Sequence, residues 1–419
     1  MTISTDLEKN NFTPAKLKPT KTLVDEVVSN FIELNLRISW LSPLLVLVTT
    51  WSCYLLSNNY TPSNPLHMFV ALSYNTNKYD ELTHDILYKK GIRDFAFIVY
   101  HMVFFTFLRQ FVMEVILRPL AIYCNMKTTP KIVRFMEQTY SIFYYSLSSP
   151  AGFYVMYHMP IWYFNTYEFY NTYPHRADPF YLKLFYLLQA SFWSQQAAIL
   201  ILQLEKPRKD FKELVFHHIV TMLLIYLSYT FHFTWIGVTI YSTMDTSDLF
   251  LATSKVLNYL DSKITGLFFA IFIFVWIYER HYLNLKILYS ILTEFKTVGP
   301  YDLNFKTGQY KCFISQPIVF FLLSCLQLVN LYWLFLILKI AFRFLFSGKE
   351  LEDVRSDAED EDEDKTYDQK IHNDKKQLNR HQRHHNLHNK ITNDEDQIET
   401  PLENVKVQTS FINDNKKEK

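Results

Sequence analysis

The sequence predicts an all-α fold: a polytopic membrane helical bundle of about eight transmembrane helices between disordered polar ends. Of its 419 residues, 49% are hydrophobic and 17% are aromatic. Apolar runs recur up to about Phe346, and each is close to the ~20 residues needed to cross a hydrocarbon core of ~30 Å. The formal net charge of +1 averages this apolar body with a highly charged tail. The composition therefore indicates a multi-span membrane protein.

The apolar runs place the eight expected spans at residues 39–56, 95–116, 138–157, 180–202, 214–231, 236–256, 264–285 and 314–342. Lysine and arginine concentrate in the loops at 117–134, 204–213 and 257–263, which favours a cytosolic position for these loops and for both termini. The sequon Asn59-Tyr60-Thr61 then falls in a lumenal loop. Four lysines in the loop at 286–312 run against this topology. The span at 236–256 is the weakest by hydropathy because it contains two aspartates.

Composition divides the chain into four parts: a cytosolic polar tail (1–38), the first two spans with their loops (39–130), six further spans (131–346) and an acidic, histidine-rich cytosolic tail (347–419). The first 30 residues lack the apolar core of a signal peptide, so no cleaved leader is expected. Blocks of like charge and polar low-complexity sequence after Gly348 cannot bury enough apolar surface to fold, which predicts disorder.

Three short features bear on cellular context. The last four residues, Lys416 to Lys419, fit the KKxx retrieval pattern of endoplasmic reticulum membrane proteins, which requires a cytosolic C-terminus. Ser356 precedes acidic residues and is a candidate phosphorylation site. The four cysteines show no CxxC spacing, so neither a zinc site nor a disulfide framework is indicated.

The chemistry concentrates between Phe211 and Asp248. This stretch places His217 and His218 in one apolar run and Asp245 and Asp248 in the next. Ionisable side chains at membrane depth are costly and by default mark a functional site. Adjacent histidines lie about 100° apart on a helix, whereas aspartates three residues apart share a face. Two antiparallel helices would bring a histidine near an aspartate, and such a pair makes the imidazole a better base or nucleophile.

Several interpretations of this pattern compete. The two histidines and two aspartates could form a buried polar network that joins two helices. They are a legitimate metal-ligand set, although adjacent histidines are poorly placed for a common ion. A proton relay for transport is the third interpretation, but the chain shows no paired halves with Gly- or Pro-broken spans. Acid–base or nucleophilic catalysis on a lipid is the interpretation we favour.

A longer motif surrounds these residues. It comprises Asp210 to Glu213, His217-His218, Ser228-Tyr229, Phe233-Thr234, Gly237, Asp245-x-x-Asp248, Lys255-x-x-Asn258-Tyr259, Trp276, Arg280, His281, Thr297 to Tyr301, Gln316-Pro317 and Leu326 to Trp333. This motif resembles the signature of ceramide synthases, in the TLC-domain (longevity-assurance) family, and is most similar to the fungal branch. The resemblance covers about residues 130–345 and departs from the pattern at Glu279, where a neutral residue is expected.

The resemblance implies that residues 131–346 form a catalytic TLC domain of six spans. It implies transfer of a long or very long fatty acyl group from acyl-CoA to the amine of a sphingoid base, giving dihydro- or phytoceramide and CoA. The expected catalytic residues are His217, His218, Asp245 and Asp248. Attack on a thioester requires a deprotonated amine, for which a histidine is a natural general base. A covalent acyl-histidine route is the alternative, and the sequence leaves both open.

The expected substrate-binding residues are Arg280, Trp276, Asn258, Lys212, Lys209 and Arg208. The basic residues near the start of the fifth span would bind CoA phosphates, or would instead serve as a positive-inside anchor. For Arg280, a structural ion pair with Glu279 or another acid is favoured, given the cost of an unpaired charge in a membrane. In the family, the loop before the last span, here about 289–313, is implicated in the choice of chain length.

The expected partners are membrane lipids, acyl-CoA as co-substrate and a sphingoid base, with no metal, no other cofactor and no nucleic acid. The resemblance adds a small single-span accessory subunit and a homo- or heterodimer. The expected location is the endoplasmic reticulum membrane, multi-pass, with both termini cytosolic. The alternatives are a non-catalytic TLC-domain lipid sensor or scaffold and, less favoured, a proton-coupled lipid transporter. The complete His-His and DxxD set argues for the enzyme.

Overall fold

The computed structural model describes residues 30–347, apart from 32, 36–37, 81–84, 127 and 203–208. Most of the N-terminal tail and the whole acidic tail, with Ser356 and the terminal lysines, therefore lie outside the described residues. Residues 30–31 and 33–35 are helical, although they fall within the stretch where a disordered tail was expected.

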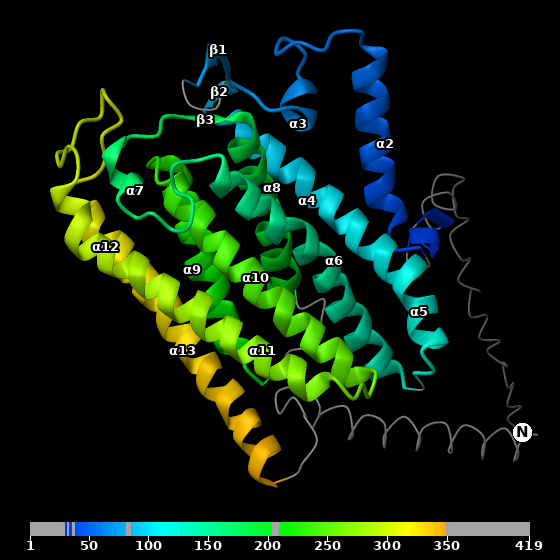
Figure 1. Cartoon of the computed structure of the whole chain (residues 1–419). Coiled ribbons are helices and arrows are strands. Elements are labelled where there is room, and N and C mark those ends of the chain that lie inside the picture. The colour runs from blue at the N-terminus through cyan, green and yellow to red at the C-terminus, as the bar shows by residue number, and fades with distance from the viewer. Residues whose placement is uncertain are drawn as a thin grey trace, which may run out of the picture. The chain divides into compact units, whose positions relative to one another are not determined.

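Long helices run alternately up and down through the described part of the chain, and their connections range from short turns to the longer segments 158–179 and 298–314 (Figure 1). Each of the eight expected spans falls on one of them. In chain order they are α2 (Leu41–Leu56), α4 (Arg93–Phe111) continued by the π-helical η1 (Val112–Leu117) and α5 (Arg118–Tyr123), α6 (Thr129–Tyr157), α8 (Phe180–Ile201), α9 (Phe211–Thr230), α10 (Thr234–Tyr259), α11 (Thr265–Ile277) continued by the π-helical η2 (Tyr278–Leu283) and α12 (Asn284–Thr297), and α13 (Ser315–Ser347).

Four helical segments among the described residues are long and apolar enough to cross a membrane by length and composition. They are Arg93–Tyr123, Phe211–Thr230, Thr265–Thr297 and Ser315–Phe346, while Leu41–Leu56 is apolar but shorter. The helices α6, α8 and α10 do not meet this criterion, so eight spans are not confirmed. The reason lies in their packing: α8 and α10 bury polar side chains such as Gln189, Gln195 and Ser242 among neighbouring helices. Polar side chains in such positions bond across helices instead of facing lipid.

The all-α expectation is corrected by a small antiparallel sheet. Its strands β1 (Asn75–Tyr79), β2 (Ile86–Lys89) and β3 (Ala177–Pro179) pair in the order β1-β2-β3. They lie at one end of the helices, with the short helices α3 (His67–Val70) and α7 (Glu168–Asn171) (Figure 1). An open sheet edge is tolerated where water is available but not in hydrocarbon. We call this the sheet end; the turn at 260–264 lies at the opposite end (Figure 1).

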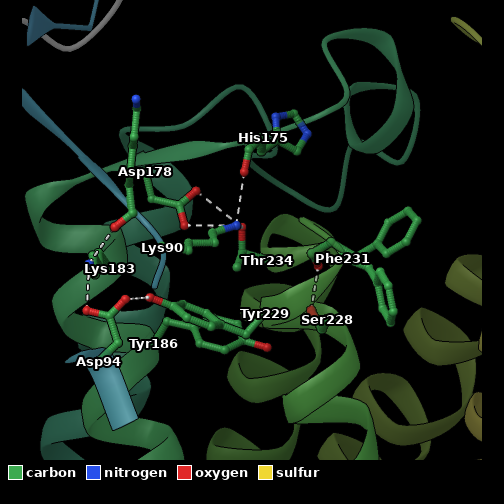
Figure 2. A network of polar contacts seen from close by, with 12 residues as sticks. Lys90, Asp94, His175, Asp178, Lys183, Tyr186, Ser228, Tyr229, Phe231 and Thr234 are labelled. Carbon is green, nitrogen blue, oxygen red and sulfur yellow. Dashed lines mark hydrogen bonds and ion pairs between the residues drawn. The ribbon is translucent and has the colours of Figure 1, made fainter. Parts of the chain in front are cut away.

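A cluster of buried charges ties the sheet end together (Figure 2). The Lys183 Nζ atom lies 2.8 Å from Asp94 Oδ1, and Lys90 Nζ lies 3.2 Å from Asp178 Oδ2. All four side chains are almost completely buried. Burial lowers the pKa of the Lys90 ammonium and raises the pKa of the Asp178 carboxyl, and each partner's charge acts against that shift. We call these four residues the charge cluster.

Breaking one of these pairs tests how the cluster contributes to stability. Lys183→Met leaves the Asp94 carboxylate buried without its cation, and we expect a loss of about 3–5 kcal/mol. The double variant Asp94→Asn/Lys183→Met removes both charges and should recover most of that loss. Thermal unfolding of the purified protein in detergent measures both variants. Equal stability of the single variant and the wild type would contradict this account.

Candidate active site

The two adjacent histidines differ in their surroundings. His217, on α9, is 6% exposed and His218 is half-buried. The Nδ1 of His218 donates to the Leu214 carbonyl at 2.9 Å, which leaves Nε2 as the nitrogen with the lone pair. The two imidazole rings lie 5.6 Å apart and nearly perpendicular. The adjacent positions therefore give one deeply buried histidine and one more accessible histidine of fixed tautomer.

Two tryptophans enclose His217. The Trp333 ring lies 5.1 Å from the His217 ring, and the Trp193 ring lies 6.1 Å from it. The Trp333 indole nitrogen donates to Asp210 Oδ2 at 3.2 Å, which fixes that ring. The Thr221 hydroxyl lies 3.5 Å from His217 Nε2. These contacts hold the His217 ring between α8, α9 and α13.

Two cavities meet at His217. The first, of about 310 Å³, extends toward the sheet end and is lined by apolar side chains that include Ile225, Phe233, Ile240, Phe305 and Leu323. The second, of about 240 Å³, is lined by Arg109, Arg134 and Lys255, by the carboxylates Glu137 and Asp248, and by other polar and apolar side chains. Trp193, His217 and Arg280 line both. We call these the apolar cavity and the cationic cavity.

Arg280 at this junction is fully engaged by neighbouring groups. Its Nη2 lies 2.5 Å from Asp248 Oδ1, and the guanidinium stacks 4.2 Å from the Trp276 ring. The guanidinium also donates to the Ser247 hydroxyl at 2.6 Å and to the Asn330 amide oxygen at 3.2 Å. The acid that pairs with Arg280 is thus Asp248, not the neighbouring Glu279. The π-helical turn η2 buries Glu279 as well as Arg280, and such turns are frequent at functional sites.

The structure separates the two aspartates. Asp248 lines the cationic cavity and holds Arg280. Asp245 is completely buried and accepts a hydrogen bond from the Gln189 side chain, whose oxygen accepts one from the Tyr144 hydroxyl at 3.0 Å. Asp245 is absent from the lining of both cavities. It therefore supports the site from behind.

The expected binding residues fall into three groups. Trp276 and Arg280 lie together in the cationic cavity. Asn258 is half-buried and lies outside the lining of both cavities. Lys209 and Lys212 are exposed near the start of α9 and do not line the cationic cavity, and Arg208 lies outside the described residues. Besides Arg280 on η2, the cations that line the cavity come from α4, α6 and α10, helices distant in the sequence.

Sequence reasoning missed several residues of the site. Trp193 was not singled out because aromatic residues are common in these helices. Trp333 and Asn330 entered only as part of the motif from Leu326 to Trp333, and no role was assigned to them. Gln189 carried a usable signal, since it is a polar side chain in an apolar run. Among the described residues, no three His, Cys, Asp or Glu side chains gather in a way that would hold a metal ion.

The arrangement defines a class of site. His217 lies between two tryptophan rings, at the junction of the apolar cavity and the cationic cavity. It fits a substrate that joins a long apolar chain to an anionic head at a reactive bond. The fold and the site together define a membrane protein with a buried histidine at the junction of two cavities.

Comparison with known proteins identifies the family. The TLC domain family matches residues 134–339. The Saccharomyces cerevisiae (strain YJM789) protein called sphingosine N-acyltransferase LAG1 is 53% identical over 345 residues, covering 82% of each chain. Sphingosine N-acyltransferase lac1 of Schizosaccharomyces pombe is 44% identical over 343 residues, covering 82% of this chain and 87% of that one. Ceramide synthase 4 of Bos taurus is 33% identical over 231 residues, 55% of each chain. The chain belongs to the TLC-domain family of ceramide synthases.

The pair at the junction gives a direct test of this geometry. Asp248→Asn leaves the Arg280 guanidinium buried without a counter-charge, and we expect it to destabilise the protein by about 3–5 kcal/mol. Adding Arg280→Met removes the orphaned cation and should restore most of the stability. Thermal unfolding in detergent distinguishes the three proteins. A double variant less stable than Asp248→Asn would show that Arg280 is held mainly by other contacts.

Proposed function

We propose that this protein is a ceramide synthase whose acyl transfer takes place on His217. It moves a fatty acyl group from acyl-CoA to the amine of a sphingoid base and releases CoA. The observation that carries the proposal is the position of His217, where the apolar cavity meets the cationic cavity. The names of the fungal relatives agree with this activity.

An acyl-CoA matches the two cavities in chemistry. Its acyl chain suits the apolar cavity, and its phosphates suit the cationic cavity, where Arg109 offers a planar guanidinium group and Lys255 a point charge. Arg134 adds a second guanidinium, although it also pairs with Glu137 at 3.3 Å. The thioester between chain and head then lies at His217. In this arrangement the exposed Lys209 and Lys212 lie outside the cavity and serve as a positive-inside anchor.

The surroundings of His217 favour the covalent route. As a general base, His217 would accept a proton and become positively charged. A second buried cation beside Arg280 would be costly. As a nucleophile, a His217 nitrogen attacks the thioester carbonyl, the carbon–sulfur bond breaks, and CoA leaves with the imidazole proton. The substrate amine then attacks the acyl-imidazole, the amide forms and the histidine is regenerated. The free amine arises by loss of a proton from the sphingoid ammonium.

The other residues take complementary roles. His218, with its tautomer fixed by Leu214, accepts the ammonium proton within the cationic cavity. Arg280 places its charge at the junction, where the thioester oxygen becomes negative during attack. Asp248 holds Arg280 in that position, and Asp245 fixes Gln189 behind the wall.

The proposal includes a membrane arrangement. We place all eight long helices across the endoplasmic reticulum membrane, with both termini and the cationic cavity cytosolic and the sheet end lumenal. The distribution of lysine and arginine in the loops supports this side for the cavity, and CoA is then delivered from the cytosol. A small single-span accessory subunit and a dimer belong to the proposal on the family resemblance alone. No metal and no cofactor other than acyl-CoA takes part in the proposed steps.

Loss of the histidines is the first test. We expect His217→Ala to abolish amide formation from labelled sphinganine and acyl-CoA, and His218→Ala to lower the rate by about 10²–10⁴ through loss of the base. Asp245→Asn should retain more activity than Asp248→Asn, because Asp245 lies behind the cavity wall. Liquid chromatography of the lipid product, on variants shown to remain folded, measures this. An active His217→Ala variant would contradict the assignment, and a wild type inactive with every acyl-CoA would favour a lipid sensor or scaffold.

The cationic cavity gives a second test. Removing a charge-assisted contact with a phosphate costs about 1.5–3 kcal/mol, which corresponds to roughly 10–100-fold in affinity. We expect Arg109→Gln or Lys255→Gln to raise the KM for acyl-CoA by that factor and to leave the KM for sphinganine within about twofold. Lys212→Gln, outside the cavity, is the matched control and should change both constants little at physiological salt. A larger effect at Lys212 would move the CoA site to the start of α9.

A further inference from the structure

The charge cluster at the sheet end is bonded well beyond its two ion pairs. Lys183 Nζ donates to the carbonyl oxygens of Ser73 and Lys89 at 2.9 and 2.7 Å. Lys90 Nζ donates to the His175 carbonyl at 2.9 Å and to the Thr234 hydroxyl at 3.2 Å. Every element that meets here is thereby fixed: the sheet, α4, α8 and the first residue of α10. Buried networks in which each ammonium group makes several bonds are rigid.

A tyrosine connects this cluster to the apolar cavity. The Tyr229 hydroxyl, at the end of α9, donates to Asp94 Oδ2 at 2.7 Å, and Lys90 Nζ lies 5.5 Å from the centre of the Tyr229 ring. The Tyr229 ring in turn stacks on the Tyr186 ring, and the two ring centres lie 5.5 Å apart (Figure 2). Tyr186 lines the apolar cavity, but Tyr229 does not. The wall of the cavity is therefore backed by charged groups through a single pair of stacked rings.

The wall of the apolar cavity is tightly packed around Tyr186. Gly237 and Ser228 line the cavity beside Tyr186. A Cβ atom at Gly237 would lie 2.8 Å from the Tyr186 ring and 2.9 Å from the Ser228 hydroxyl oxygen. Neither approach is possible without movement. Any side chain at position 237 must therefore push Tyr186, which the charge cluster holds from behind.

This level of the wall is far from the reacting bond. Ser228 and His217 are eleven residues apart on the same helix, which at 1.5 Å per residue is about 16 Å. A group at that distance contacts the distal part of an acyl chain and not the thioester. Changes there should alter which chains fit and leave the acyl-transfer chemistry in place.

We propose that the charge cluster is a positioning device for acyl-chain selection. Through Tyr229 it fixes Tyr186, and Tyr186 with Gly237 and Ser228 sets the width of the apolar cavity where the distal part of the chain lies. The inference rests on the proposed function, because it takes the apolar cavity to be the acyl-chain site. It assigns a role in specificity to Lys90, Asp94, Asp178 and Lys183, which lie far from the reacting groups.

The test measures chain selection in the full-length protein in native membranes. Wild type and variants receive labelled sphinganine and single acyl-CoAs from palmitoyl to hexacosanoyl, and each amide product is quantified. Tyr229→Phe keeps the ring but removes the hydrogen bond to Asp94. It should lower the ratio of preferred to disfavoured chain lengths by about fivefold, as expected for the loss of one buried hydrogen bond. Gly237→Ala narrows the cavity by one methyl group and should lower kcat/KM for the longest accepted chain by about tenfold, leaving the shortest within about twofold.

Tyr54→Phe is the matched control. Tyr54 is 7% exposed, and its hydroxyl lies 2.9 Å from His67 Nδ1, but Tyr54 lines neither the apolar nor the cationic cavity. Loss of the Tyr54 hydroxyl should leave the ratios between products of different chain length unchanged. The inference is overturned if Tyr229→Phe and Gly237→Ala leave the ratios at the Tyr54→Phe values. A wild type that makes no amide from any acyl-CoA overturns the proposed function instead, so the two failures are distinguishable.

Discussion

The ion pair between Arg280 and Asp248 is the constraint on which the rest of the site depends. A cation at this depth is tolerated because Asp248 neutralises it, Trp276 covers its face, and Ser247 and Asn330 accept its remaining hydrogen bonds. These contacts join η2 to α10, α11 and α13. Arg280 in turn lies beside His217 on the lining of both cavities. One satisfied charge therefore fixes both the packing of the helices and the place where the cavities meet.

A second set of buried charges stands at the sheet end, and the apolar cavity extends from one set toward the other. Apolar contacts are adaptable, because hydrophobic side chains of similar volume replace one another at small cost. Buried charged groups are less adaptable, because each requires particular partners. Placing such groups behind Tyr186 and beside His217 keeps the cavity wall from relaxing around a chain of the wrong length. Rigidity at both places is what a selective acyl-chain site requires.

The sequence predicted the long helices and the residues at the centre of the site, because both follow from local rules. Apolar runs of about twenty residues indicate helices, and ionisable residues within them drew attention to His217, Asp248 and Arg280. The pairing of Arg280 with Asp248 joins segments 32 residues apart, and no local rule selects that partner over Glu279. The strands escaped prediction because they lie outside the apolar runs. Apart from Arg280, the cations of the cationic cavity were not predicted as a group, because they meet only when α4, α6 and α10 pack.

The central claim is that His217 carries the acyl group, and peptide mass spectrometry tests it most directly. The protein in detergent is mixed with acyl-CoA without sphingoid base, quenched and digested. We predict an acyl adduct on the peptide containing His217, absent from His217→Ala, and its disappearance as ceramide forms when sphinganine is added. Ceramide synthesis without any adduct on His217, under conditions where an acyl-imidazole survives digestion, would contradict the account and return the histidine to the role of general base.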